Sequence, residues 1–227
     1  MPAALAAFLV VALVHLGAQA TAPDGLIAGI TQVCLMPALA WVLHASTPDP
    51  KSRLVRLVLV ALGLSWIGDT IPRFIPAGTN LDLALMLGAF VLAQLVYVVA
   101  FAPFVGRSIL RTRPKLLIPY ALALLVVLGV TAGAGSFFVG VVVYGVVIVT
   151  MAILATGLDR IAGIGGALFM VSDALIAVRA FGGLAVPHHD LWVMLTYILA
   201  QAMIVMAVAN GDRLLVDDEL PVAARRA

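Results

Sequence analysis

Eight apolar stretches constrain the fold of this chain more than any other feature. A membrane-spanning helix needs about 20 mostly apolar residues to cross a hydrocarbon layer about 30 Å thick. The stretches occupy residues 3–20, 25–44, 54–72, 81–104, 115–132, 136–156, 161–181 and 190–210. None of them alternates with a period of two, and each is about twice as long as a barrel strand. The sequence therefore predicts an all-α fold, an integral membrane bundle of eight transmembrane helices.

Composition and charge agree with a membrane protein. The chain is 64% hydrophobic and 11% charged, whereas soluble domains are about 45–50% apolar and about 25% charged. The net charge is only +2, so no nucleic-acid partner is expected. Cys34 is the single cysteine and cannot form an intrachain disulfide. We expect one transmembrane domain over residues 1–212, with its first stretch retained rather than cleaved as a leader, and a cytoplasmic tail over 213–227.

The basic residues predict the orientation in the membrane. Cytoplasmic loops carry an excess of Lys and Arg. Eleven of the 13 lie at the C-terminus or near the loops after the second, fourth and sixth stretches, and only Arg73 and Arg179 lie on the other side. We therefore expect a multi-pass protein of the plasma (inner) membrane with both termini cytoplasmic.

Two segments of the chain resemble each other. FVLAQLVYVVA (90–100) and YILAQAMIVMA (197–207) are 107 residues apart, and Asp69 and Asp173 are 104 apart. Because each half has an even number of stretches, the halves, about 1–106 and 113–212, are predicted to form two parallel four-helix repeats. Chance recurrence in a background of Ala, Val and Leu is the alternative.

Asp69 and Asp173 are the polar residues that most need an explanation. A carboxylate within a membrane costs about 2.5–3.5 kcal/mol on insertion scales and by default marks a functional site. The alternatives are helix caps or ion pairs, between Asp69 and Arg73 and between Asp173 and Arg179. Two carboxyls in one pocket can instead share a single proton near neutral pH and act as an acid and a base.

Other polar groups are expected to converge with the two acids on one cavity open to the outer leaflet. These candidate substrate-binding residues are Gln32, Ser65, Arg73, Gln94, Tyr97, Ser172, Arg179, Tyr197 and Gln201. For the glutamines and tyrosines, the alternative is hydrogen bonding between helices. For the arginines, it is a side chain that extends to the interface, as against binding of a phosphate.

The sequence does not favour a metal or a serine nucleophile. No two of His15, His44, His188 and His189 are spaced by three or four residues on one helix, as a metal site in a bundle would prefer. No Gly-x-Ser-x-Gly motif occurs. We therefore expect neither a metal ligand set nor a cofactor.

Several motifs resemble those of the YhhN-type lysoplasmalogenase family. They are Ser65-x-x-Gly68-Asp69, Gly88-x-Phe90 with Gln94 and Tyr97, Gly165-Gly166-Ala167-Leu168-Phe169 before Ser172-Asp173, and Tyr197 with Gln201. The resemblance implies a membrane hydrolase that cleaves the vinyl ether of lysoplasmalogens into a fatty aldehyde and a glycerophospho-amine. The family usually has Lys where Gln32 stands and His where Gln94 stands.

The reaction implied by the resemblance needs an acid, a base and water, and the depth of the candidate residues in the membrane suggests which side chains supply them. A vinyl ether hydrolyses when its β-carbon is protonated and water adds to the resulting cation. Asp173 is expected to be the acid and Asp69 the base, with Arg73 and Arg179 at the phosphate of a lysophospholipid substrate. Two other functions remain open, a transporter or lipid-binding membrane protein and a catalytically silent relative. The oligomeric state is open too.

Overall fold

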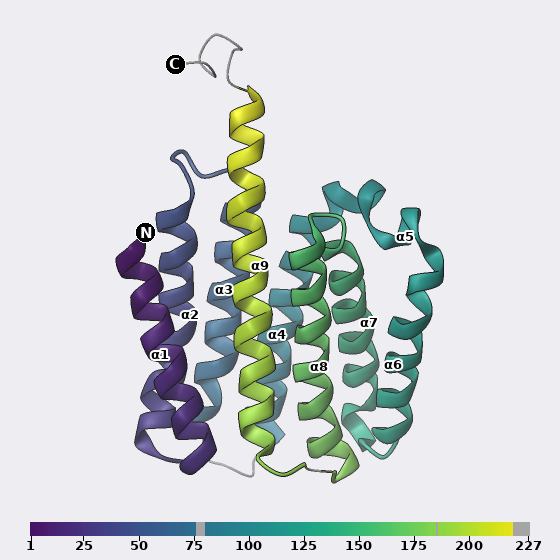
Figure 1. Ribbon diagram of the computed structural model, residues 1–227. Helices are drawn as coiled ribbons and strands as arrows, with labels where there is room; N and C mark the ends of the chain where they lie inside the picture. The colour runs from purple at the N-terminus through teal and green to yellow at the C-terminus, as the bar shows by residue number, and fades with distance from the viewer. Residues whose placement is uncertain (76–79, 185, 220–227) are drawn as a thin grey trace.

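The computed structural model is a bundle of long helices (Figure 1) and describes residues 1–75, 80–184 and 186–219, with side chains through Asp212. Its long helices are α1 (Pro2–Thr21), α2 (Leu26–Ser46), α3 (Arg53–Thr70), α4 (Asn80–Phe101), α6 (Leu117–Val130), α7 (Phe138–Ala155), α8 (Arg160–Gly182) and α9 (His189–Glu219). The short α5 (Ile109–Thr112) lies between α4 and α6. No strand occurs in these described ranges. The all-helical prediction is confirmed.

Each of the eight predicted stretches forms a helix, but the helices are not equal in length. Within the described ranges, seven are long and apolar enough to cross a membrane, which makes this a multi-pass membrane protein. The exception is α6, an apolar helix of 14 residues. The 3-10 turn η3 (Pro114–Leu116) leads directly into it, and the two together extend about 27 Å, slightly less than the thickness of the hydrocarbon layer.

Local signals in the sequence fix several helix ends. Ser52 caps α3 by accepting a hydrogen bond from the Val55 amide at 3.2 Å. Asp159 caps α8 in the same way, accepting from the Ala162 amide at 2.6 Å. The same helix ends before Gly183, whose φ of +64° is the left-handed conformation that glycine tolerates best. The capped helix α8 is one of the two that position the acids.

Glycines allow α8 to pack closely against both of its neighbours. A Cβ on Gly165 would lie 2.9 Å from the carbonyl oxygen of Ala200 in α9. On Gly166 it would lie 2.8 Å from the Cα of Ala152 in α7. Small residues of this kind let membrane helices approach each other closely, and the Gly-Gly pair thereby sets the position of α8 between α7 and α9.

The two ends of the bundle differ. Figure 1 shows the N-terminus and the C-terminal end of α9 at the same end, and the turn that joins α1 to α2 at the other. The last helix continues to Glu219 and so enters the predicted tail, 213–227. Residues 220–227 of that tail lie outside the described residues.

Gly166→Ala should destabilise the protein by about 1–3 kcal/mol, because the added methyl group meets backbone atoms of α7 that cannot rotate away. The matched control is Gly63→Ala in α3, where a Cβ would meet no atom within 4 Å. Thermal unfolding in detergent measures both variants. Equal unfolding midpoints for the two variants would contradict the close packing of α7 and α8.

Candidate functional site

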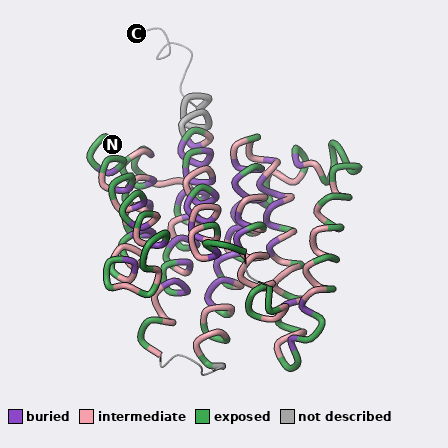
Figure 2. Tube along the Cα trace, turned by 60° about the horizontal axis from the view of Figure 1, so that its bottom comes forward, coloured by how far each residue is buried: buried purple, intermediate pink, exposed green. Residues whose placement is uncertain are grey.

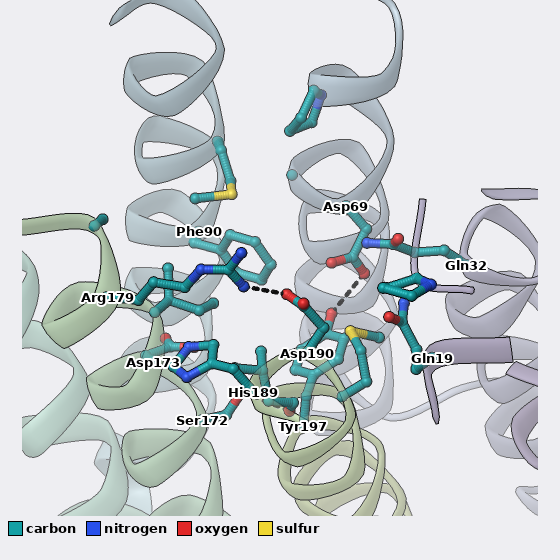
Figure 3. A pocket seen from close by; sticks show the side chains of 18 of the residues that line it. Gln19, Gln32, Asp69, Phe90, Ser172, Asp173, Arg179, His189, Asp190 and Tyr197 are labelled. Atoms are coloured by element: carbon teal, nitrogen blue, oxygen red, sulfur yellow. Dashed lines mark hydrogen bonds and ion pairs between the residues drawn. The ribbon is translucent and has the colours of Figure 1, made fainter. Parts of the chain in front are cut away.

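A cavity of about 580 Å³ lies at the end of the bundle opposite the N-terminus and the C-terminal end of α9. Its walls come from α3, α4, α8 and α9, from the 3-10 turn η1 (Ile71–Arg73), and from α1, α2 and the turn between them. Figure 3 shows side chains from these elements converging on it. The predicted site residues on its walls are Gln32, Asp69, Arg73, Ser172, Asp173, Arg179 and Tyr197.

Asp69 lies near the end of α3 and is held by a tyrosine. Its side chain is buried, with the residue only 8% exposed. The Tyr197 hydroxyl of α9 donates to Asp69 Oδ2 at 2.8 Å (Figure 3). Tyr197 in turn packs edge-on against Phe90 and Phe169, with ring centroids 6.0 and 5.4 Å away. The carboxyl therefore keeps a fixed position on the cavity wall.

Gly68, the residue before Asp69, makes room for this aromatic cluster. A Cβ on Gly68 would lie 2.9 Å from the ring of Phe90. The Gly-Asp pair of the sequence motif thus has two linked functions: the glycine admits the ring, and the aspartate bonds the tyrosine that packs on it.

Asp173 lies in α8, nine residues before its last residue, Gly182. A different tyrosine, Tyr144 of α7, donates its hydroxyl to the Asp173 carboxyl. The fully buried Gln94 lies beside that hydroxyl. The two acids of the cavity are thus each bonded to a tyrosine from a neighbouring helix, and no hydrogen bond joins one acid to the other within the described residues.

Neither acid forms an ion pair with the arginine that the sequence offered as its alternative partner. Arg179 pairs instead with Asp190 at the start of α9, at 2.6 Å (Figure 3). Arg73 extends over Gly29 to α2, where it donates to the side-chain oxygen of Gln32. The alternative that each acid forms an ion pair with the nearby arginine of its own segment, Asp69 with Arg73 and Asp173 with Arg179, is therefore wrong.

Four predicted site residues lie outside the cavity wall. Ser65, Gln94, Tyr97 and Gln201 are fully buried, and none of them lines the cavity. The Tyr97 hydroxyl donates to Gln201 Oε1 at 2.6 Å, and Gln201 Nε2 donates to Ser65 Oγ at 3.2 Å. These two bonds link α4, α9 and α3 beneath the site, as hydrogen bonding between helices would, whereas neither side-chain amide atom of Gln94 has a hydrogen-bond partner among the described residues.

The structure adds residues that the sequence did not single out as site residues. His189 lines the cavity, is 7% exposed, and has no hydrogen-bond partner on either ring nitrogen within the described chain. Gln19, Asp24 and Asp190 also line it. Tyr144 was missed because it stands in the uniformly apolar segment FVGVVVYGVVIVT, where no neighbour signals a role.

The cavity offers no evident metal ligand set. Among the described residues, no group of three or more His, Cys, Asp and Glu side chains lies close enough to hold a metal ion. What the arrangement can do is move protons, since two carboxyls, two phenols and an imidazole lie on or next to one cavity.

Comparison with known proteins gives one match. A family model described as the YhhN family matches residues 26–208, which include both acids and both of their tyrosines. The resemblance in the sequence motifs is thereby confirmed. No curated protein and no solved structure matches the chain.

Tyr197→Phe should lower the stability by about 1–3 kcal/mol, because the buried Asp69 carboxyl loses its hydrogen-bond donor. Tyr120→Phe is the matched control, since the Tyr120 hydroxyl has no hydrogen bond among the described residues and the residue lies in the peripheral α6. Thermal unfolding in detergent separates the two. If both variants unfold at the wild-type temperature, the Tyr197–Asp69 hydrogen bond does not contribute to the stability of the protein.

Proposed function

The chain belongs to the YhhN family, and we propose that it is a membrane hydrolase of the lysoplasmalogenase type. It would cleave the vinyl ether of a lysoplasmalogen, releasing a fatty aldehyde and a glycerophospho-amine. One observation supports this most strongly: Asp69 and Asp173, from separate helices, line one cavity, and each bonds a tyrosine rather than a guanidinium.

The reaction needs an acid, a base and water. A protonated carboxyl transfers its proton to the β-carbon of the vinyl ether, which leaves an oxocarbenium ion. Water adds to the carbon of this cation that bears the oxygen and gives up a proton to the second carboxylate. The resulting hemiacetal breaks its carbon–oxygen bond, with its hydroxyl proton passing to the leaving oxygen, to give aldehyde and alcohol. One water is consumed, and the proton on the second carboxyl must pass back to the first before the next turnover. Two carboxyls in one cavity can divide these steps between them.

The surroundings of the two acids support distinct roles. Asp173 adjoins the apolar side chains of Phe90 and Ile176 on the cavity wall, where the alkenyl carbon of the substrate would lie. Asp69 is on the side of Gln32 and Arg73, at the polar mouth. We assign Asp173 as the acid that protonates the carbon, and Asp69 as the base that orients water.

Arg73 is the better candidate for the substrate phosphate. Its guanidinium contacts a neutral amide, Gln32, whereas Arg179 is already neutralised by Asp190. Arginine presents several donors in a fixed plane that suits phosphate oxygens. The contact with Gln32 also brings a cation to the position where the family usually has Lys.

The finer features of the fold belong to the same proposal. Eight spans in two parallel repeats would bring Asp69 and Asp173 to the same side of the membrane, as their shared cavity requires. Because Lys and Arg concentrate at the other end, the cavity would open toward the outer leaflet of the inner membrane, with both termini cytoplasmic.

Asp69→Asn and Asp173→Asn should each reduce aldehyde release by at least about 100-fold, since general acid–base steps contribute about 10²–10⁴-fold. The measurement is aldehyde formed from purified lysoplasmalogen by the protein in detergent. Asp49→Asn, in the loop at the other end of the bundle and 75% exposed, is the control and should keep full activity.

Failure of the wild-type protein to consume any lysoplasmalogen in detergent would favour one of the two rivals. A transporter would move lipid only across a sealed vesicle membrane. A catalytically silent relative would neither cleave the lipid nor move it across a membrane. In that case, the double substitution Gln32→Lys with Gln94→His would restore the residues that the family usually has. New activity in that double variant would identify the chain as catalytically silent.

Arg73→Gln should raise the KM for lysoplasmalogen about 10-fold with little change in kcat, because it removes a charged contact made equally in the ground and transition states. Arg179→Gln should have a smaller effect on KM, since its charge is already paired. Steady-state kinetics over a range of lipid concentrations measures both. The reverse order of the two effects would assign the phosphate to Arg179.

A further inference from the structure

Two smaller cavities adjoin the site at Asp173. One, of about 100 Å³, lies between α6, α7 and α8. The other, of about 30 Å³, lies between α4, α7 and α8. Asp173 lines both of them as well as the large cavity, and Tyr144 lines both of the smaller ones. The three spaces therefore meet at one carboxyl.

The chemistry of the walls changes at that carboxyl. On one side, the large cavity has Asp69, Arg73, Arg179, His189 and Asp190 on its walls. On the other side, Asp173 and the Tyr144 hydroxyl provide the only polar side-chain groups of the two smaller cavities. The remaining lining of the cavity at α6 consists of Ala123, Leu124, Val127, Val141, Gly145, Ile148, Val149, Met170, Val171, Ala174 and Ala177.

The outer wall of this apolar space is α6, which packs more loosely than the other long helices. None of its residues, Leu117–Val130, is buried. It stands at the edge of the bundle in Figure 1, and along it the tube of Figure 2 carries no buried residue. The space between α6 and the α7–α8 pair thus lies one helix away from the surrounding lipid.

We propose that the space between α6, α7 and α8 is the slot for the single hydrocarbon chain of the substrate, with Asp173 at the boundary between chain and head group. This inference rests on the proposed function and adds where each part of the lipid binds. In a lysoplasmalogen the vinyl ether joins the polar glycerol phosphate to the alkyl chain. A substrate with its phosphate in the polar cavity and its chain in the slot has that bond beside Asp173.

Gly145 controls the width of the slot. It lines the apolar cavity in α7, and a Cβ there would lie 2.6 Å from Cδ1 of Leu124 in α6. A larger residue at this position would occupy the space that the chain needs. Gly140, one turn and a half earlier in the same helix, has no atom within 4 Å of a Cβ position and offers a matched control.

The test uses a lysophosphatidylethanolamine that carries a diazirine in the middle of its acyl chain. After irradiation of the wild-type protein in detergent, mass spectrometry should find the label on the slot residues of α6, α7 or α8. Gly145→Leu should reduce that labelling about tenfold, which corresponds to about 1.4 kcal/mol, and Gly140→Leu should leave it unchanged. Label concentrated at Gln19 and Pro23, on the opposite wall of the large cavity, would overturn the slot.

Because labelling does not depend on turnover, the experiment tests the slot and the proposed function independently. Wild-type protein that labels in the slot but releases no aldehyde would overturn the function alone. If lysoplasmalogens are cleaved, Gly145→Leu should shift the preference toward shorter chains, and an unchanged chain-length profile would overturn the slot alone. Ala177→Leu, which fills both apolar cavities, serves as a second variant if Gly145→Leu does not fold.

Discussion

A carboxyl among membrane helices needs a hydrogen-bond donor, and two tyrosines supply one each. Tyr197 reaches Asp69 from α9, and Tyr144 reaches Asp173 from α7. Since an unsatisfied polar group in a low-dielectric interior is costly, these bonds fix which helices must be neighbours at the site. The glycines of α8 and Gly68 of α3 then let those helices and rings approach closely enough for the bonds to form.

The fold was largely predictable, because membrane-spanning segments can be recognised in a sequence by their length and hydropathy. The stretches for α1–α4 and α7–α9 were long enough to span, and capping by Ser52 and Asp159 fixed the ends of two of them. The stretch 115–132 forms the 3-10 turn η3 followed by α6, which ends at Val130, two residues before the predicted end. Hydropathy measures how apolar a segment is, whereas helix length depends on the local backbone.

The site was predictable only in part. Asp69 and Asp173 stood out because acids are rare in such segments, and both line the cavity. Their partners could not be deduced from sequence spacing: Arg73 and Arg179 are at helical distances from the acids, yet they contact Gln32 and Asp190. A tyrosine in an apolar helix gives no sign of the direction in which its hydroxyl points. For that reason Tyr144 was found only in the structure.

The segments 90–100 and 197–207 also differ at an informative position. Phe90 occupies the place in the first that Tyr197 occupies in the second, so one acid has a phenol from that position and the other does not. Asp173 obtains its donor from α7 instead. The two acids thus have different environments, which suits the proposed reaction, in which one carboxyl donates a proton and the other accepts one.

The length of α6 has a consequence for the lipid around the protein. Where this helix crosses the bilayer, α6 and the 3-10 turn before it together provide about 27 Å of helix for about 30 Å of hydrocarbon. A short hydrophobic segment is accommodated by local thinning of the membrane. The shortest of the long helices, α6, would thereby make turnover sensitive to the thickness of the surrounding membrane.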